Sequence, residues 1–202
     1  PRRPFSRGFL DHLSPRGQMN NDCRPRRHGE PINQQQRLPR WIFLWLAMST
    51  IVVVWDALFV LLRPGSFPDG DIGFLWSFAY TIYLEVDHSY GDLTNHVIEA
   101  MAVMSLFEAC LVGVALVLDK RGLAHKAHLV AMLAAALTCA KTTLFFLVEG
   151  MHGWHSIAHN DVLSMVTLYI IPNGLWIVVP LLVVVTLSKR LLGGALLNPQ
   201  AP

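Results

Sequence analysis

Four long apolar runs constrain the fold of this chain more than any other feature. They span residues 41–62, 97–118, 129–148 and 163–187. Each is long enough for a helix to cross about 30 Å of hydrocarbon, and only a helix or a closed barrel satisfies its backbone polar groups there. Hydrophobic residues make up 53% of the 202 residues. We therefore predict an all-α, polytopic membrane protein whose single membrane domain, residues 41–190, is a four-transmembrane-helix bundle.

The distribution of charge predicts the orientation of the bundle. Residues 1–40 hold nine Arg against three acids, and the connection 119–126 is also basic. The connection 63–96 has one Arg and five acids, and 149–162 has two acids and no Lys or Arg. Basic segments favour the cytoplasmic side, so both termini are expected there. We predict a disordered basic tail over 1–40, rich in Arg, Pro, Asn and Gln, and a short C-terminal tail over 191–202.

The connection 63–96 contains an aromatic stretch, FLWSFAYTIYL, at residues 74–84. Eleven residues are too few to span a membrane as a helix. One interpretation is an interfacial segment whose aromatic rings lie at headgroup level. The other is a lid that folds over the bundle, and the two are compatible.

Polar residues inside the apolar runs predict an intramembrane cavity. Counted from the non-cytoplasmic side, six residues fall in one layer of the bilayer: Asp56, Glu99, Glu108, Lys141, Asn173 and Trp176. Polar residues in spans usually face the bundle interior and mark functional sites. The layer is therefore expected to be the wall of a polar cavity.

Each of these residues also has a structural interpretation. Lys141 and Glu108 lie at similar depths on neighbouring helices, which favours a structural ion pair. Glu99 is close enough to the interface to be merely solvated, and Trp176 could serve packing alone. Asp56 has no cation within one helical turn, so it is expected to be an unpartnered buried carboxyl that keeps its proton, as a general acid must.

Histidines offer two further possibilities. His96 and Glu99 are three residues apart on one helical face and could handle a proton together. In the connection 149–162, His152, His155 and His159 have a spacing that invites a zinc interpretation, but no cysteine or H-E-x-x-H pattern supports it. Glycine-rich phosphate loops and dinucleotide fingerprints are absent from the sequence. We expect no metal and no cofactor.

Two stretches carry a family resemblance. FFLVEGMHGW at 145–154, followed by YIIPNGLWIVVP at 169–180, resembles the last two helices of the emopamil-binding protein family, the EXPERA domain. YGDLTNHVIEA at 90–100 resembles the approach to the family's second helix, and VVWDALFVLL at 53–62 resembles the end of its first. The resemblance implies catalytic roles for Asp56 and Glu99, to which we add His96. It implies that the substrate is bound by these residues: Tyr90, Glu149, Trp154, Asn173 and Trp176.

The function implied by this resemblance is a cofactor-free isomerisation. The best-known members are sterol Δ8–Δ7 isomerases of the endoplasmic reticulum, which protonate a ring double bond, hold the carbocation beside a tryptophan and remove a neighbouring proton. An aromatic face and nearby carboxylates suit that chemistry. The expected partners are a sterol or related polycyclic terpenoid and the lipid bilayer, with a homodimer left open and no nucleic acid.

One departure from the family pattern keeps a second function open. The sterol isomerases carry a histidine one turn before the first-helix acid, where this chain has Val52; His96 or His88 could replace it. The sigma-2 receptor branch of the family, with Asp at the position of Asp56, implies a lipid-binding protein without turnover. A small transporter or scaffold is disfavoured because no broken-helix repeat is visible.

Overall fold

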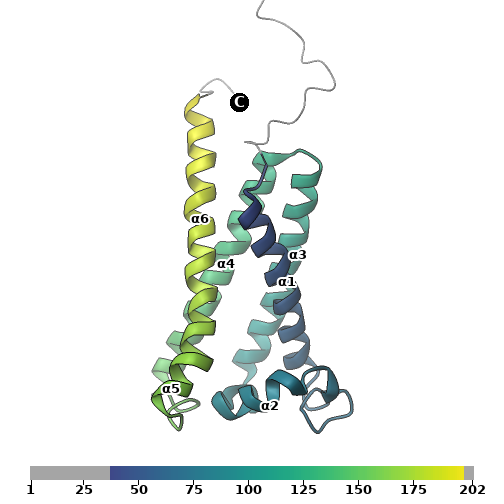
Figure 1. The fold of residues 1–202 in the computed structure, drawn as a ribbon, viewed down its shortest axis with the longest axis vertical. Coiled ribbons are helices and arrows are strands. Elements are labelled where there is room, and N and C mark those ends of the chain that lie inside the picture. The colour runs from purple at the N-terminus through teal and green to yellow at the C-terminus, as the bar shows by residue number, and fades with distance from the viewer. Residues whose placement is uncertain (1–36, 198–202) are drawn as a thin grey trace, which may run out of the picture. The chain divides into compact units, whose positions relative to one another are not determined.

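The structure, a computed structural model, describes residues 37–197, and every regular element within them is helical (Figure 1). Four helical spans are long and apolar enough to cross a membrane: α1 (Arg40–Leu61), α3 (His96–Lys120), α4 (Ala124–Met151) and Val162–Gly193. The last span combines α5 (Val162–Ser164), the π-helix η4 (Met165–Ile170) and α6 (Ile171–Leu197). The predicted four-helix membrane bundle is confirmed, and it fits a multi-pass integral membrane protein.

The ends of the chain differ from the prediction where they are described. Most of the predicted tail, residues 1–36, lies outside the described residues, but Leu38 is buried and its N–H donates to Asp119 Oδ1 at 2.8 Å. At the other end α6 runs to Leu197, past residue 190, where the prediction ends the membrane domain. Residues 198–202 lie outside the described part.

Local sequence signals fix the helix ends. Asn95 caps α3, because its side chain accepts from Val97 N at 3.2 Å and Ile98 N at 3.4 Å. Gly122 follows α3 with φ 76°, a left-handed conformation that suits glycine. The Gly122 and Leu123 N–H groups then bond Asp119 and Leu118 O, a Schellman ending that reverses the chain into α4.

The long helices pack in the order α1, α3, α4, α6. The buried residues of α3 recur every three or four positions: Ile98, Ala102, Ser105, Glu108, Val112, Ala115 and Asp119. In α4 the buried positions include four alanines, Ala127, Ala131, Ala134 and Ala135, and small residues allow helices in membranes to approach closely. The outer helices α1 and α6 make little backbone contact with each other.

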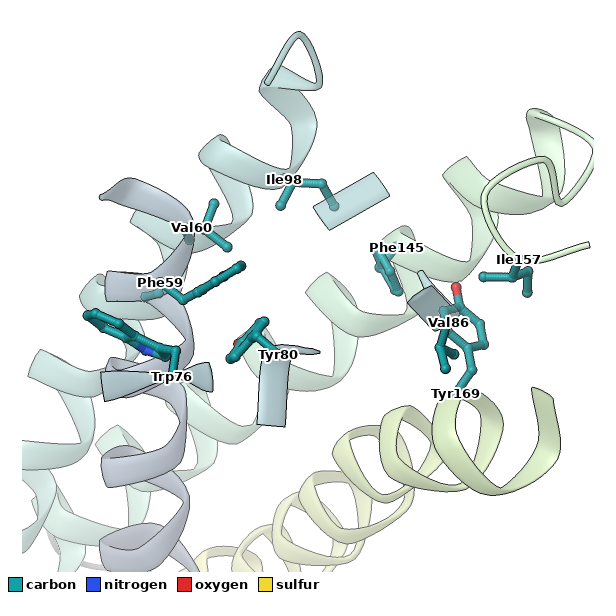
Figure 2. Packing of buried hydrophobic residues seen from close by; sticks show 11 residues of the cluster. Phe59, Val60, Trp76, Tyr80, Val86, Ile98, Phe145, Ile157 and Tyr169 are labelled. Atoms are coloured by element: carbon teal, nitrogen blue, oxygen red, sulfur yellow. The ribbon is translucent and has the colours of Figure 1, made fainter. Parts of the chain in front are cut away.

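The aromatic connection forms a short helix that covers one end of the bundle. After the 3₁₀ turn η2 (Gly73–Leu75), α2 (Ser77–Val86) runs across the end where α5 lies (Figure 1). Trp76 Nε1 donates to Trp55 O at 2.9 Å, which fixes the start of α2 to α1. Asn160 Nδ2 donates to Val86 O at 2.8 Å, which fixes its end to the α4–α5 loop. Figure 2 shows Tyr80 beside Phe59 and Val86 beside Tyr169, so α2 bridges the two sides and acts as the cover that the second interpretation expected.

Candidate functional site

A pocket of about 390 Å³ lies inside the helices, beneath α2. Its volume falls within the range of small-molecule sites. The walls are mostly apolar and aromatic, and the polar groups that line it include Asp56, Ser105, Thr138, Lys141, Thr142 and Asn173 together with three tyrosines, Tyr80, Tyr83 and Tyr90. A few polar groups converging on an apolar cavity are typical of a ligand-binding site.

Asp56 in α1 is bound by tyrosines from the segment above it. The Tyr80 hydroxyl donates to Asp56 Oδ1, and the Tyr90 hydroxyl is a second hydrogen-bond partner of this carboxyl. The expectation of an unpartnered carboxyl is therefore wrong. The sequence missed these partners because they lie 24 and 34 positions away along the chain.

The tyrosine cluster formed by Tyr80, Tyr83 and Tyr90 is packed tightly. Tyr80 stacks on Phe59 with ring centroids 3.6 Å apart, and Tyr83 meets Tyr90 edge to face at 5.0 Å. Burial raises the pKa of all three phenols, and the nearby Asp56 carboxylate adds to the shift for Tyr80 and Tyr90. The cluster therefore presents protonated hydroxyl donors at neutral pH.

Asn173 enters the pocket from a distorted stretch of the last span. Pro172 has no N–H and its ring crowds the preceding turn, and the helix before it widens, with Ile171 N–H bonding Val166 O. Such π-helical turns are frequent at functional sites. Asn173 Nδ2 donates to Tyr169 O at 2.9 Å, and its side chain also bonds Tyr83. The distorted turn therefore ties the last span to the tyrosine cluster.

Trp176 forms the wall between the pocket and a smaller cavity of about 20 Å³. Its ring lies 5.5 Å from that of Trp45, at an interplanar angle of 53°. This contact crosses the space between α1 and α6. Trp176 thus packs and also presents a face to the pocket.

Lys141 and Glu108 form the ion pair that the sequence suggested. Lys141 Nζ lies 3.2 Å from Glu108 Oε2 and also donates to Ser105 Oγ. Thr138 Oγ1 donates to the same carboxylate oxygen at 2.9 Å. Lys141 lines the large pocket and Glu108 lines the small cavity, so the pair is structural and also reaches both spaces.

Comparisons with known proteins identify no relative of this chain. No protein-family model, no curated protein and no solved structure matches the chain. The chemistry of the pocket is therefore defined by its own residues.

Of the predicted catalytic residues, Glu99 and His96 do not line the pocket. Glu99 Oε1 lies 3.6 Å from Arg63 Nη2, and His96 Nδ1 lies 3.0 Å from Glu99 Oε2. The His96 side chain is 83% exposed. The expectation that Glu99 belongs to the cavity wall is wrong, because α3 turns Ile98 and Ala102 toward the pocket instead.

Of the predicted substrate-binding residues, Glu149 and Trp154 also lie outside the pocket lining. Glu149 is buried and accepts from Ser156 N at 2.8 Å, which shapes the α4–α5 loop. Trp154 has φ 60° in the ending of α4, its N–H bonds Glu149 O, and its ring covers Gly150. Both residues organise the loop. Tyr90, Asn173 and Trp176 line the pocket.

The loop histidines are placed by contacts with α2 and η3 (His88–Tyr90). His159 stacks on His88 with ring centroids 3.9 Å apart, and its Nε2 lies 2.6 Å from Glu85 O. His152 and His155 are exposed. Within residues 37–197 no three His, Cys, Asp or Glu side chains gather as a metal site would require.

Two groups of residues escaped the sequence reasoning. Tyr80 and Tyr83 lie in the stretch predicted to be an interfacial segment or a lid, and no contact with Asp56 was expected, although their spacing of three puts them on one helical face. Arg63 was noted only as a charge, yet its buried guanidinium donates to Val60 O at 3.0 Å, Tyr90 O at 2.8 Å and Asp92 O at 3.3 Å. No local pattern marks such a residue, because its partners are carbonyls.

Proposed function

We propose that the pocket binds a polycyclic lipid, a sterol or related terpenoid, and shifts a double bond in it by adding one proton and removing another. The observation that carries this proposal is the hydrogen-bonded pair of Asp56 and Tyr80 facing an apolar pocket with Trp176 in its wall. A large apolar volume inside membrane helices suits a rigid hydrocarbon skeleton. A proton donor and acceptor suffice for the chemistry, so no cofactor is required.

The charges around the pocket support a cationic intermediate. The pocket and its small neighbour hold one lysine, Lys141, against two carboxylates, Asp56 and Glu108. Because Lys141 is paired with Glu108, Asp56 is the carboxylate of the pocket that forms no ion pair. A negative group and an aromatic face in a low-dielectric site stabilise a carbocation.

In this proposal Asp56 transfers the protons, and Tyr80 and Tyr90 hold its carboxyl in place. Trp176 supplies the aromatic face and Asn173 orients the ligand or the tyrosine cluster. The resemblance to the emopamil-binding protein family supports the same substrate class. It also supports a location in the endoplasmic reticulum, and the charge distribution supports cytoplasmic termini.

Lipid binding without turnover is the second candidate. It is favoured by the position of Glu99 and His96 outside the pocket lining and by Val52 in the pocket wall. With a single acid in the lining of the large pocket, a bound lipid has fewer routes for moving a proton between two carbons. This candidate shares the pocket and the ligand class with the first.

Conversion of a Δ8-sterol by purified protein in deuterated water separates the two. A Δ7 product that carries solvent deuterium is expected from the wild type and not from Asp56→Asn. Asp71→Asn is the matched control, because Asp71 is exposed and lies outside the pocket lining; it should convert like wild type. Tight sterol binding with no product in any variant would support the second candidate. Loss of conversion in Glu99→Gln with full conversion in Asp56→Asn would refute the assignment to Asp56.

A further inference from the structure

The small cavity beside the pocket has one carboxylate, Glu108, in its lining. Glu108 is 3% exposed and its Oε1 has no hydrogen-bond partner among the described residues. Its other oxygen, Oε2, is occupied by Lys141 and Thr138. A buried carboxylate oxygen without a donor is costly, so this atom points to a group that the site is built to receive.

None of the other polar groups of the cavity bonds Glu108 Oε1. Ser49 and Thr50 both donate to Leu46 O, at 3.2 and 2.7 Å. The Thr138 hydroxyl donates to Glu108 Oε2 and to Ala134 O. Their hydroxyl protons are therefore in use, and only their oxygen lone pairs remain. Trp45 and Trp176 also line the cavity, but neither indole N–H bonds Glu108 Oε1, which has no partner among the described residues.

The size and position of the cavity define what could donate to this oxygen. Its volume of about 20 Å³ holds about one water-sized group. Val53, Thr138 and Trp176 line both spaces, so a group carried at the end of a ligand in the large pocket can reach it. Lys141 uses two of its three N–H groups on Ser105 and Glu108, and the third is available to an oxygen that accepts.

We propose that the small cavity is a subsite for a ligand hydroxyl, which donates to Glu108 Oε1. The inference rests on the proposed binding of a polycyclic lipid and narrows it to molecules that carry an alcohol at one end. A ketone at the same place accepts from Lys141 but leaves Glu108 unsatisfied. A hydrocarbon satisfies neither.

Binding of three saturated sterols tests the subsite without any turnover. Cholestanol carries the alcohol, cholestanone the matched ketone and cholestane neither. Their competition against a radiolabelled sterol is measured on the full chain in detergent. The wild type is expected to bind cholestanol about tenfold more tightly than cholestanone, the usual value of a hydrogen bond to a charged group.

Glu108→Gln should reverse this preference. Its amide oxygen would accept from Lys141 and Thr138, which turns the amide N–H groups toward the cavity, where they donate to a ketone. The ketone is then expected to bind at least as tightly as the alcohol. Asp87→Asn is the matched control, because it makes the same change at a buried acid outside both cavities, and it should keep the alcohol preference.

The outcomes are distinguishable. Equal binding of cholestanol and cholestanone by the wild type would overturn the subsite while leaving the proposed pocket intact, and this comparison does not depend on the folding of any variant. An alcohol preference that persists in Glu108→Gln would assign recognition to another residue and also overturn it. Failure of all three sterols to bind would overturn both the subsite and the proposed function.

Discussion

The bond between Tyr80 and Asp56 should be measurable as a coupling energy between the two side chains. Tyr80→Phe removes the hydroxyl and keeps the ring, so the stacking on Phe59 at 3.6 Å remains. Tyr80 is 4% exposed, and solvent cannot replace the lost donor. Hydrogen bonds between membrane helices average about 0.6 kcal/mol and reach about 1.7 kcal/mol. Because the acceptor here is a carboxyl, we expect about 1.5 kcal/mol.

The assay is a double-mutant cycle. Wild type, Tyr80→Phe, Asp56→Ala and the double variant are unfolded reversibly in mixed micelles, and the free energies of unfolding are compared. The losses of unfolding free energy in the two single variants, added together, should exceed the loss in the double variant by about 1.5 kcal/mol. Thermal unfolding of Tyr80→Phe should show a Tm lower by about 3–6 °C.

The neighbouring bond between Tyr83 and Asn173 is the matched control. Both of its partners are neutral, so the cycle of Tyr83→Phe with Asn173→Ala should give about 0.6 kcal/mol. A coupling below about 0.5 kcal/mol for Tyr80 and Asp56 would refute the reasoning, because the carboxyl would then be held by something other than this hydroxyl.

Three more expectations concern the surroundings of the pocket. Arg63→Met should destabilise the protein far more than Glu99→Gln in chemical unfolding, because the buried guanidinium donates hydrogen bonds to three carbonyls. The half-exposed carboxylate of Glu99 contributes about 1 kcal/mol or less. Equal losses of unfolding free energy in the two variants would contradict this. Burial raises the pKa of Asp87 to about 6 from about 3.9 in the unfolded chain. Its contribution to stability is therefore fully present below about pH 4 and is lost as the pH rises to about 6. Asp87→Asn should flatten the dependence of Tm on pH across that window, and an unchanged slope would exclude Asp87 as its source. Val52→Cys is made in a chain whose three native cysteines are replaced by Ser. Bound cholestanol should protect its thiol from a lipid-soluble reagent, because Val52 lines the pocket and is 47% exposed. Leu44→Cys, exposed on the same helix outside the pocket, should not be protected.

The positions of the polar residues along the helices were predictable from the sequence, but the face of each helix was not. Glu99 and Ile98 are adjacent, and a helix turns by about 100° between them. The buried face of α3 passes through Ile98, so Glu99 points away from the pocket and meets Arg63. In a soluble helix the alternation of polar and apolar residues reveals the buried face. In α3 both the lipid and the bundle interior accept apolar side chains, so that pattern is missing.

The tyrosine cluster escaped prediction for a related reason. A tyrosine at a membrane interface and a tyrosine in a pocket wall both need an apolar ring environment and a partner for the hydroxyl. The sequence of α2 is therefore the same for either role. What decides between them is whether a buried polar partner lies within reach, and here Asp56 and Asn173 are the partners. Both lie on other helices, so only the packed bundle reveals them.

The pairing of charges then determines which acid a ligand can meet. Had Lys141 paired with Asp56, the pocket would offer a ligand a neutralised ion pair. Instead Lys141 forms its ion pair with Glu108 and donates to Ser105. Asp56 is hydrogen-bonded by neutral hydroxyls that can reorient. A carboxyl that forms no ion pair can take part in proton transfer without first breaking a buried salt bridge. This division of partners allows one acid to act on a ligand while the other receives its hydroxyl, and it places the proposed chemistry on Asp56.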